Sequence, residues 1–195
     1  MEKLIKKYLE TKNPDTLHKM RVLARKTLSK LAIENKTDLY LKKLMKLSSK
    51  IRDSDVMMEK CKHKKIKNYL LKIKRKELKK FLKFLKNYHS EIVKINKNKI
   101  SLKKCKKICK KNFLKLNNKK LHKIRIEIKK CRYSLKMNEL KLLQTLLGEV
   151  HDLENCIKLM KKFHLNKKQI KKLKLKYIKK ANKEKNKICK SSLLN

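Results

Sequence analysis

The sequence predicts an all-α protein, and three observations lead to this prediction. The 195 residues include one glycine and one proline, so the residues that build tight turns between β-strands are nearly absent. Leucine and isoleucine recur at spacings of three and four along most of the chain, which is the period of an amphipathic helix. A segment of the first half also recurs in the second half. Gly148 stands alone, which excludes the glycine-rich phosphate loops of nucleotide-binding enzymes.

Helical spacing begins near the N-terminus. The apolar residues within 4–9 predict a short helix that ends before Pro14. Asn13 is then expected to cap the next helix, with Pro14 at its first helical position. The apolar face of that helix consists of Leu17, Met20, Ala24, Leu28 and Leu31.

The remaining elements follow the same spacing. A shorter helix is expected over 39–48, and it leads into the segment 51–60 (IRDSDVMMEK). A long helix comes next, with an apolar face of Leu78, Phe81, Leu85, Tyr88, Ile92 and Ile95. The last helix mirrors that long helix and carries Ile170, Leu173, Tyr177 and Ile188.

The second half of the chain repeats the first. Residues 117–135 align with residues 13–31 at an offset of 104 and share seven identical positions, among them the capping asparagine. A weaker echo sets EVHDLEN (149–155) against KIRDSDV (50–56). Internal duplication on this scale predicts one domain made of two similar helical halves, residues 1–98 and 99–195.

The charge of the chain predicts an anionic partner. Lysine and arginine number 62 and aspartate and glutamate 16, which gives a formal charge of +46. A chain this basic repels itself, and a polyanion relieves that repulsion. Only six of these basic residues are arginines, so most lysines are expected to form a solvated surface rather than a site.

Basic residues border the apolar face of the repeated helix. In the second copy, the apolar face at 100° per residue consists of Leu121, Ile124, Ile128, Cys131 and Leu135. The stripe beside it consists of His122, Arg125, Lys129 and Arg132. The first copy places His18, Arg21 and Arg25 on the same stripe, with Leu28 at the fourth position. Such a stripe lies at the lip of a helical bundle and does not point into bulk water.

The rare arginines are concentrated at these places. Five of the six lie in the repeat helices or in the segment 51–60: Arg21, Arg25, Arg52, Arg125 and Arg132. Three of the six histidines follow the same bias: His18, His122 and His151. Guanidinium groups bind oxyanions through two parallel hydrogen bonds, so phosphate-sized anions fit these donors. The alternative is that the basic groups pair with Asp53, Asp55 and Asp152 and lock the helices together.

These residues resemble the paired motifs of the CHAD family of helical domains. In that family a helix with an HxxRxxxRRxR-like pattern occurs twice, and each copy precedes a helix that opens with an RD or HD segment. Four segments look like this pattern, in the same order and over nearly the whole chain: LHKMRVLARK (17–26), IRDSDV (51–56), LHKIRIEIKKCRY (121–133) and LLGEVHDLE (146–154).

The resemblance implies two pseudo-symmetric antiparallel four-helix bundles packed around a basic groove or pore that binds inorganic polyphosphate. The positions that match its anion contacts are His18, Arg21, Arg25, Lys26, His122, Arg125, Lys129, Lys130 and Arg132. Supporting positions are Arg52, Asp53, His151 and Asp152, of which the two aspartates are expected to orient nearby basic side chains. Because Leu28 departs from the basic pattern, the first half is expected to contact the polyanion less extensively. Neither catalysis nor a cofactor is expected.

The lack of a targeting signal and the spacing of the cysteines predict a cytoplasmic protein. Association with polyphosphate or storage granules is a further expectation. The start of the chain lacks an apolar stretch of signal-peptide length, and no segment reaches the roughly 20 apolar residues of a membrane helix. The six cysteines lack the spacing of a disulfide framework and are expected to be reduced core thiols. Cys105 and Cys109 are four apart, which is half of a metal site at most.

Three other functions were weighed against polyphosphate binding. A lysine-rich surface binds DNA or RNA weakly and non-specifically at low salt, but aromatic residues for base stacking make up only 5% of the chain. His151 and Asp152 spell the HD doublet of metal-dependent phosphohydrolases, and His122 or His164 is available as a further ligand. Lysine-rich amphipathic helices also attract acidic lipids, although their apolar faces are expected to form bundle cores.

Overall fold

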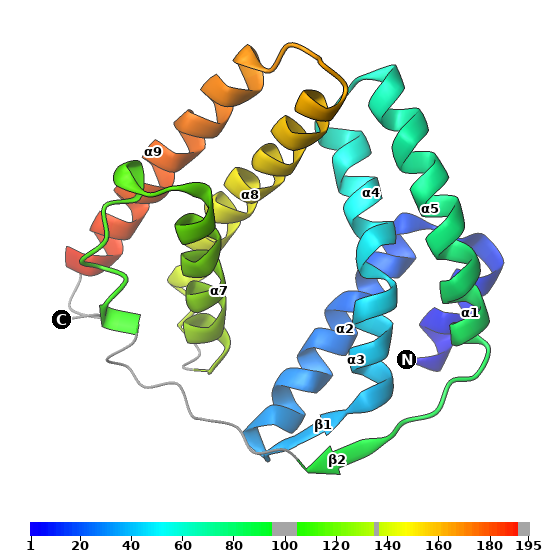
Figure 1. The fold of residues 1–195 in the computed structure, drawn as a ribbon. Coiled ribbons are helices and arrows are strands. Elements are labelled where there is room, and N and C mark those ends of the chain that lie inside the picture. The colour runs from blue at the N-terminus through cyan, green and yellow to red at the C-terminus, as the bar shows by residue number, and fades with distance from the viewer. Residues whose placement is uncertain (95–104, 135–136, 191–195) are drawn as a thin grey trace. The chain divides into compact units, whose positions relative to one another are not determined.

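The computed structural model describes residues 1–94, 105–134 and 137–190, and these residues are mainly helical (Figure 1). The all-α prediction is therefore confirmed, apart from one small sheet. The chain divides into two compact units, Met1–Asn98 (unit 1) and Lys99–Asn195 (unit 2), and each is described by itself. Among the described residues, no helix is both long enough and apolar enough to cross a membrane.

The helices of unit 1 are joined by short connections. They are α1 (Glu2–Thr11), α2 (Pro14–Ile33), α3 (Leu39–Leu47), α4 (Ser49–Lys60) and α5 (Lys64–Leu85). The expected start of α2 is confirmed, because Asn13 Oδ1 accepts a hydrogen bond from the backbone N–H of Asp15 at 2.7 Å and Pro14 is the first helical residue. The helices expected over 4–9 and 39–48 are confirmed as α1 and α3.

The core of unit 1 lies between α1, α2, α3 and α5, with Ile51 of α4 at its edge. Tyr8 of α1 is 1% exposed, and its ring meets Phe81 of α5 edge-on with 5.8 Å between centroids. Each fully buried side chain of this size stabilises the fold by about 1.5–3 kcal/mol relative to exposure. The buried apolar residues are Ile5, Tyr8, Leu17, Met20, Ala24, Tyr40, Leu41, Leu44, Ile51, Phe81 and Leu85.

A two-stranded antiparallel sheet departs from the all-α expectation. Strand β1 (Lys36–Asp38) pairs with β2 (Ile92–Lys94), and Thr37 stands opposite Val93. Asp38 holds this region together, since its Oδ1 accepts from the backbone N–H of Leu41 at 2.9 Å and its Oδ2 accepts from Ser90 Oγ at 2.8 Å. The same carboxylate therefore caps α3 and anchors the segment that leads into β2.

The long helix expected to reach Ile95 is wrong beyond Leu85. The helix α5 ends there, and Tyr88 packs edge-on against Tyr40 with 4.8 Å between ring centroids. Ile92 belongs to β2, and Ile95 lies outside the described residues. The apolar spacing persists past α5, but the intervening residues 86–91 include Asn, Tyr, His and Ser, which have weak helix propensity.

Unit 2 is built on a helical hairpin. Helices α8 (Leu140–Lys162) and α9 (Lys168–Lys190) lie side by side, and α7 (Asn118–Ser134) packs along α8 (Figure 1). Asn117 repeats the cap of unit 1, because its Oδ1 accepts from the backbone N–H of Lys120 at 2.9 Å. A short 3-10 helix, η1 (Phe113–Lys115), precedes α7.

The predicted apolar face of α7 forms part of the core of unit 2. Leu121, Ile124, Ile128 and Cys131 are all buried, whereas Leu135 lies outside the described residues. Helix α8 supplies the opposite wall of this core through Leu140, Leu143, Leu147 and Val150, and α9 closes it with Ile178, Ala181 and Ile188.

The expectation of reduced core thiols is wrong, because none of the described cysteines is a free thiol. Cys105 forms a disulfide with Cys131 of α7, and Cys109 forms one with Cys189 of α9. The partners are 26 and 80 residues apart in sequence, so spacing along the chain gave no sign of them. With both thiols of the Cys105/Cys109 pair in disulfides, the half metal site proposed for them is also wrong.

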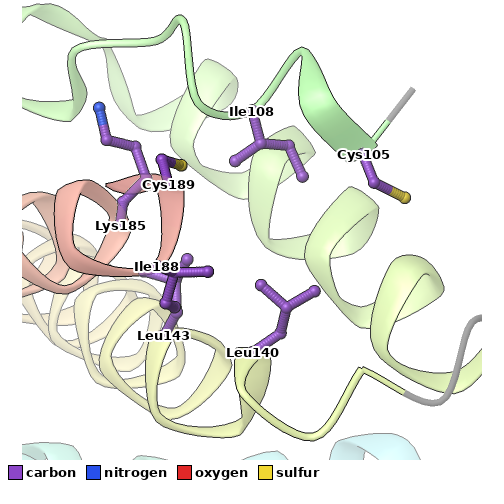
Figure 2. Close-up of a pocket in the computed structure, with 7 residues that line it drawn as sticks. All are labelled: Cys105, Ile108, Leu140, Leu143, Lys185, Ile188 and Cys189. Carbon is purple, nitrogen blue, oxygen red and sulfur yellow. The ribbon is translucent and has the colours of Figure 1, made fainter. Parts of the chain in front are cut away.

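The disulfides flank a small pocket between the start of α8 and the end of α9 (Figure 2). Its volume is about 10 Å³, which is room for one water molecule. Apolar side chains and the stem of Lys185 surround it, and the full lining is Cys105, Ile108, Leu140, Leu143, Lys185, Ile188 and Cys189. This end of unit 2 is therefore closely packed.

Candidate anion-binding site

The repeat helices place most of the candidate basic residues at the edge of the core. Residues that lie between the buried and the exposed face are half-buried, as a stripe beside an apolar face requires. They are Arg21, Arg25, Arg52, His122, Arg125, Lys129, Arg132, His151 and Asp152. The other candidates are exposed: His18, Lys26, Asp53 and Lys130.

In unit 2, the two histidines of the candidate site touch. The Nδ1 atoms of His122 on α7 and His151 on α8 are 3.3 Å apart, and the ring centroids are 4.6 Å apart. Asn155, one turn further along α8, brings its Nδ2 within 3.3 Å of His151 Nε2. One proton arrangement inferred from these partners satisfies both contacts: His151 donates from Nδ1 to His122, and Asn155 donates to His151 Nε2. His122 then keeps an N–H at Nε2 for a further acceptor.

His151 is held in its neutral form. Burial and the charges of Arg125, His122 and Lys158 together lower the pKa of His151 to about 4, against the opposing charge of Glu154. Because His151 is neutral, the positive charge next to it comes from the arginine and lysine side chains. An anion that binds here therefore meets a polar surface with a concentrated positive charge.

Arg125 has a donor without a partner. Its Nε is buried and makes no hydrogen bond within the part of the chain that the structure describes. The helix α8 comes close at this point, because a Cβ on Gly148 would lie 4.0 Å from that Nε. A buried donor left unsatisfied costs about 1–3 kcal/mol. An oxyanion that accepts from it recovers this cost.

The stripe continues toward the end of α7. Arg132 donates from Nη1 to Gln144 Oε1 at 3.3 Å, and its guanidinium lies over the ring of Tyr133 at 5.2 Å from the centroid. Lys129 is half-buried on the same side of the helix, whereas Lys130 is exposed on the outer side. The first three predicted positions of the stripe and Arg132 therefore share one edge of α7, and Lys130 does not.

In unit 1, the equivalent arginine, Arg21, forms hydrogen bonds within the protein. Arg21 Nη1 donates to the carbonyl of Met45 at 2.8 Å and to Ser48 Oγ, which itself donates to the carbonyl of Leu44 at 2.6 Å. Burial lowers the pKa of Arg21, as do Arg25 and Arg52, and Asp53 opposes them. Arg21 thus ties α2 to the end of α3, where sequence reasoning expected an anion contact.

The remaining basic groups of unit 1 form a compact positive cluster on α2 and α4. Arg25 Nε donates to the carbonyl of Arg21 at 3.1 Å. Partial burial lowers the pKa of His18, and the charges of Arg52, Arg25 and Arg21 add to this, against Asp15. His18 and Arg52 therefore lie near each other, as His122 and His151 do in unit 2.

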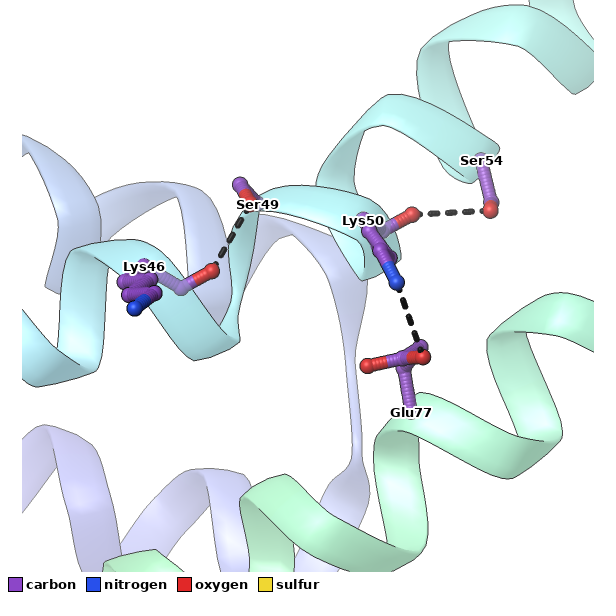
Figure 3. Close-up of polar contacts among 5 residues, drawn as sticks. All are labelled: Lys46, Ser49, Lys50, Ser54 and Glu77. Atoms are coloured by element: carbon purple, nitrogen blue, oxygen red, sulfur yellow. Dashed lines mark hydrogen bonds and ion pairs between the residues drawn. The ribbon is translucent and has the colours of Figure 1, made fainter.

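Polar contacts fix α4, which carries Arg52 and Asp53 (Figure 3). Ser49 Oγ donates to the carbonyl of Lys46 at 2.7 Å across the junction with α3. Ser54 Oγ donates to the carbonyl of Lys50 at 2.8 Å, and Lys50 Nζ donates to Glu77 Oε1 of α5 at 3.3 Å. Helix α4 is therefore held to both α3 and α5.

One pair of interactions recurs in both units and was missed in the sequence. Lys74 Nζ of α5 lies 2.5 Å from Asp55 Oδ1 of α4, and Lys174 Nζ of α9 lies 2.7 Å from Glu154 Oε2 of α8. Asp55 and Glu154 occupy matching positions of the echo between residues 50–56 and 149–155. The alternative in which Asp55 locks the arginines is therefore wrong, since a lysine of the next helix takes this carboxylate.

The described residues contain no group of three or more histidine, cysteine, aspartate or glutamate side chains that could hold a metal ion. Of the two further ligands considered for the HD doublet, His122 contacts His151, whereas His164 lies in the turn after α8 with a positive φ of 53°. Comparison of the chain with protein-family models, with curated proteins and with solved structures finds no match.

Proposed function

We propose that this protein binds inorganic polyphosphate, without catalysing a reaction on it, through the basic stripes of α2 and α7. The observation that supports this most directly is the buried Nε of Arg125, which has no hydrogen-bond partner among the described residues. It stands beside the His122–His151 pair, in a chain with a formal charge of +46. A bound oxyanion would stabilise both the donors without acceptors and the excess positive charge.

The chemistry of polyphosphate suits this arrangement. It is an unbranched chain of phosphates with no bases to be read, so rows of cationic donors are sufficient for recognition. Guanidinium groups add paired hydrogen bonds that lysine does not offer. Most of the affinity comes from counterion release, so binding weakens steeply as salt increases.

Unit 2 is the stronger half of the proposed site. Arg125 keeps a free donor, whereas its counterpart Arg21 is bonded to Met45 and Ser48. Asp53 and Asp152 remain, in this proposal, the residues that orient the basic side chains around them. The two four-helix bundles and the basic groove of the CHAD family belong to the same proposal, together with a cytoplasmic or granule-associated location.

The competing proposal is non-specific binding of nucleic acid. Lysines on the outer faces of α5 and α9 favour it, since Lys72, Lys76, Lys172 and Lys176 are all exposed. A duplex bound by such a surface depends on total charge and not on any one arginine. The two proposals therefore differ in how much a single residue at the stripe matters.

The test is titration of labelled long-chain polyphosphate at several salt concentrations against wild type, Arg125→Ala and Arg75→Ala. Arg75 is the arginine outside the repeats and is exposed on α5, so its removal changes the charge equally. Loss of a charge-assisted donor is expected to weaken binding of Arg125→Ala by about tenfold or more. Arg75→Ala is expected to stay within about twofold of wild type, because it loses only a screened surface charge. Equal losses in the two variants would contradict the proposal.

A further inference from the structure

Residues 105–113 of unit 2 are held to the helices by two disulfides and by buried side chains, which include Ile108 and Phe113. This segment has almost no regular structure, apart from the two helical residues at its start. The disulfide Cys105–Cys131 ties its beginning to the last part of α7, and Cys109–Cys189 ties its middle to the last turn of α9. Both bonds lie at the packed end of the unit, around the pocket of Figure 2.

Most of the polar contacts of the segment come from α9. Lys185, which is 6% exposed, donates from Nζ to the carbonyls of Cys109 at 3.2 Å and Lys111 at 2.8 Å. Asn182 Oδ1 accepts from the backbone N–H of Phe113 at 3.0 Å. Burial lowers the pKa of Lys185, so this lysine is held at a cost in desolvation. On the side of α7, Lys111 Nζ donates to Glu127 Oε2 at 3.5 Å, and the disulfide of Cys105 adds a covalent link to this helix.

At the corresponding positions, unit 1 has apolar packing. Its first element is the regular helix α1, which inserts Ile5 and Tyr8 into the core beside α2 and α5. No cysteine occurs in α1 or α2. By the offset of the repeat, Cys109 of unit 2 occupies the position of Ile5 in unit 1. A disulfide thus stands where unit 1 uses apolar packing.

We propose that thiol–disulfide exchange at Cys105–Cys131 and Cys109–Cys189 controls the folding of unit 2 and leaves unit 1 unaffected. The reagent is a low-molecular-weight thiol couple such as glutathione. Opening one disulfide converts two reduced thiols of the couple into its disulfide, and their two electrons and two protons give the two cysteine thiols. Closing the bond reverses this transfer. The proposal does not depend on what unit 2 binds.

The position of Cys131 connects this exchange to the basic stripe. Cys131 lies on α7 directly before Arg132, and its disulfide holds the end of the helix that carries the stripe. In the reduced protein this end of α7 loses its only covalent link to the preceding segment among the described residues. Any ligand of the stripe in unit 2 is therefore expected to bind more weakly after reduction.

The first experiment maps the pairs by mass spectrometry of aerobically purified protein after alkylation. Trypsin separates Cys105 from Cys109, because Lys106 and Lys107 lie between them, and each linked peptide then identifies one disulfide. We expect Cys105 linked to Cys131 and Cys109 linked to Cys189. Four alkylated thiols in folded protein would overturn the proposal.

The second experiment compares wild type with Cys105→Ser/Cys131→Ser and Cys109→Ser/Cys189→Ser, in which Cys61 and Cys156 are unchanged. Each variant is expected to lower the melting temperature of unit 2 by roughly 10 °C or more. Hydrogen exchange followed by mass spectrometry locates the loss: protection is expected to fall in α7 and α9 and to persist in α1 and α2. Equal loss in both units, or none in either, would overturn the proposal. If one variant does not fold, the other variant with the same exchange readout decides between these outcomes.

Discussion

Two arginines at matching positions of the repeat have different partners. Arg21 is bonded to the carbonyl of Met45 and to Ser48 Oγ, whereas Arg125 has a buried Nε without a partner in the described part of the chain. The echo between the halves, at an offset of 99 residues, sets Leu147 where unit 1 has Ser48. Replacing a hydroxyl by an aliphatic side chain removes an acceptor for the guanidinium. The position that matches Ser48 therefore offers Arg125 no hydroxyl acceptor.

Removal of these two arginines is expected to have different effects on stability. Arg21→Ala leaves Ser48 and the end of α3 without their charged partner and is expected to lower the free energy of unfolding by about 1–3 kcal/mol. Arg125→Ala removes a buried donor that is already unsatisfied, so the relieved cost offsets the lost packing and the loss of stability is expected to be smaller than for Arg21→Ala. Urea unfolding of both variants measures the difference, and a larger loss in Arg125→Ala would contradict the assignment of roles.

Protonation of His151 is expected to destabilise the protein in mild acid. Its pKa is lowered to about 4 by burial and by Arg125, His122 and Lys158, while an unfolded histidine titrates near 6.5. The unfolded chain therefore binds the proton more readily, so the contribution of His151 is complete above pH 6.5 and is lost as the pH falls toward 4. Between pH 7 and pH 5 the loss, discounted for partial exposure, is about 1–2 kcal/mol.

The measurement is urea unfolding at pH 7 and pH 5 for wild type, His151→Gln and His164→Asn. His151→Gln is expected to lose less stability on acidification than wild type. His164→Asn is the control, because His164 is exposed and asparagine tolerates its positive φ. An identical pH response in wild type and His151→Gln would show that another group is responsible.

At the scale of elements, the helices of both halves could be predicted from the sequence with their caps. Asn13 and Asn117 mark the starts of α2 and α7, and spacing identified the buried faces. The end of α5 could not be predicted, because Tyr88 and Ile92 keep the helical spacing, although Tyr88 packs on Tyr40 beyond the helix and Ile92 is exposed in β2. Register between distant segments has no local signal, which is why the β1–β2 pair and the two disulfides were missed.

The candidate site could be predicted in composition but not in the roles of its members. The spacing of His122 and Arg125 placed them on one edge of α7, and the HD segment placed His151 on the next helix. The contact between His122 and His151 depends on the packing of α7 on α8, which the sequence does not specify. The hydrogen bond of Arg21 to Ser48 depends on the junction of α3 and α4, where one residue separates the 9-residue helix α3 from the next helix.

Helix α8 is expected to become more stable when its glycine is replaced. Gly148 lies in the interior of this 23-residue helix, and a Cβ would meet Arg125 Nε at 4.0 Å, an ordinary contact. Gly148→Ala is therefore expected to raise the free energy of unfolding by about 0.5–1 kcal/mol through helix propensity alone. Thermal unfolding measures the gain. A loss of stability would mean that α8 and α7 need more space here than the structure leaves them.

The lysine–carboxylate pairs between consecutive helices are expected to matter more than surface pairs. Asp55 is 8% exposed and Lys74 19%, so Lys74→Met leaves a buried carboxylate unpaired and is expected to cost about 3 kcal/mol. Asp55→Asn in the same chain is expected to recover most of this loss. The exposed pair Lys36–Glu34, at 43% and 59%, is the control, with an expected cost below about 1 kcal/mol for Lys36→Met. Urea unfolding of the four proteins gives these values, and equal costs for the two lysines would contradict the prediction.

Over the whole molecule, the formal charge of +46 destabilises the compact fold and favours the binding of a polyanion. Like charges on the surface repel in the compact state, and salt screens this repulsion within a Debye length of about 8 Å at physiological ionic strength. The same salt removes the gain from counterion release when a polyanion binds. The affinity measured at low salt therefore depends mainly on the total charge. The contribution of the stripe residues is measured near physiological salt.

We propose that polyphosphate is bound by the stripe of α7 and not by charge alone. The most direct measurement is competition near physiological salt, in which labelled long-chain polyphosphate is challenged with duplex DNA at equal phosphate concentration. It compares wild type with Arg125→Ala/Arg132→Ala and with the charge-matched control Arg75→Ala/Lys176→Ala, whose residues are exposed on α5 and α9. Wild type and the control are expected to prefer polyphosphate, and the stripe variant to lose that preference. If DNA competes equally for wild type, or if both variants lose the preference alike, the claim is contradicted.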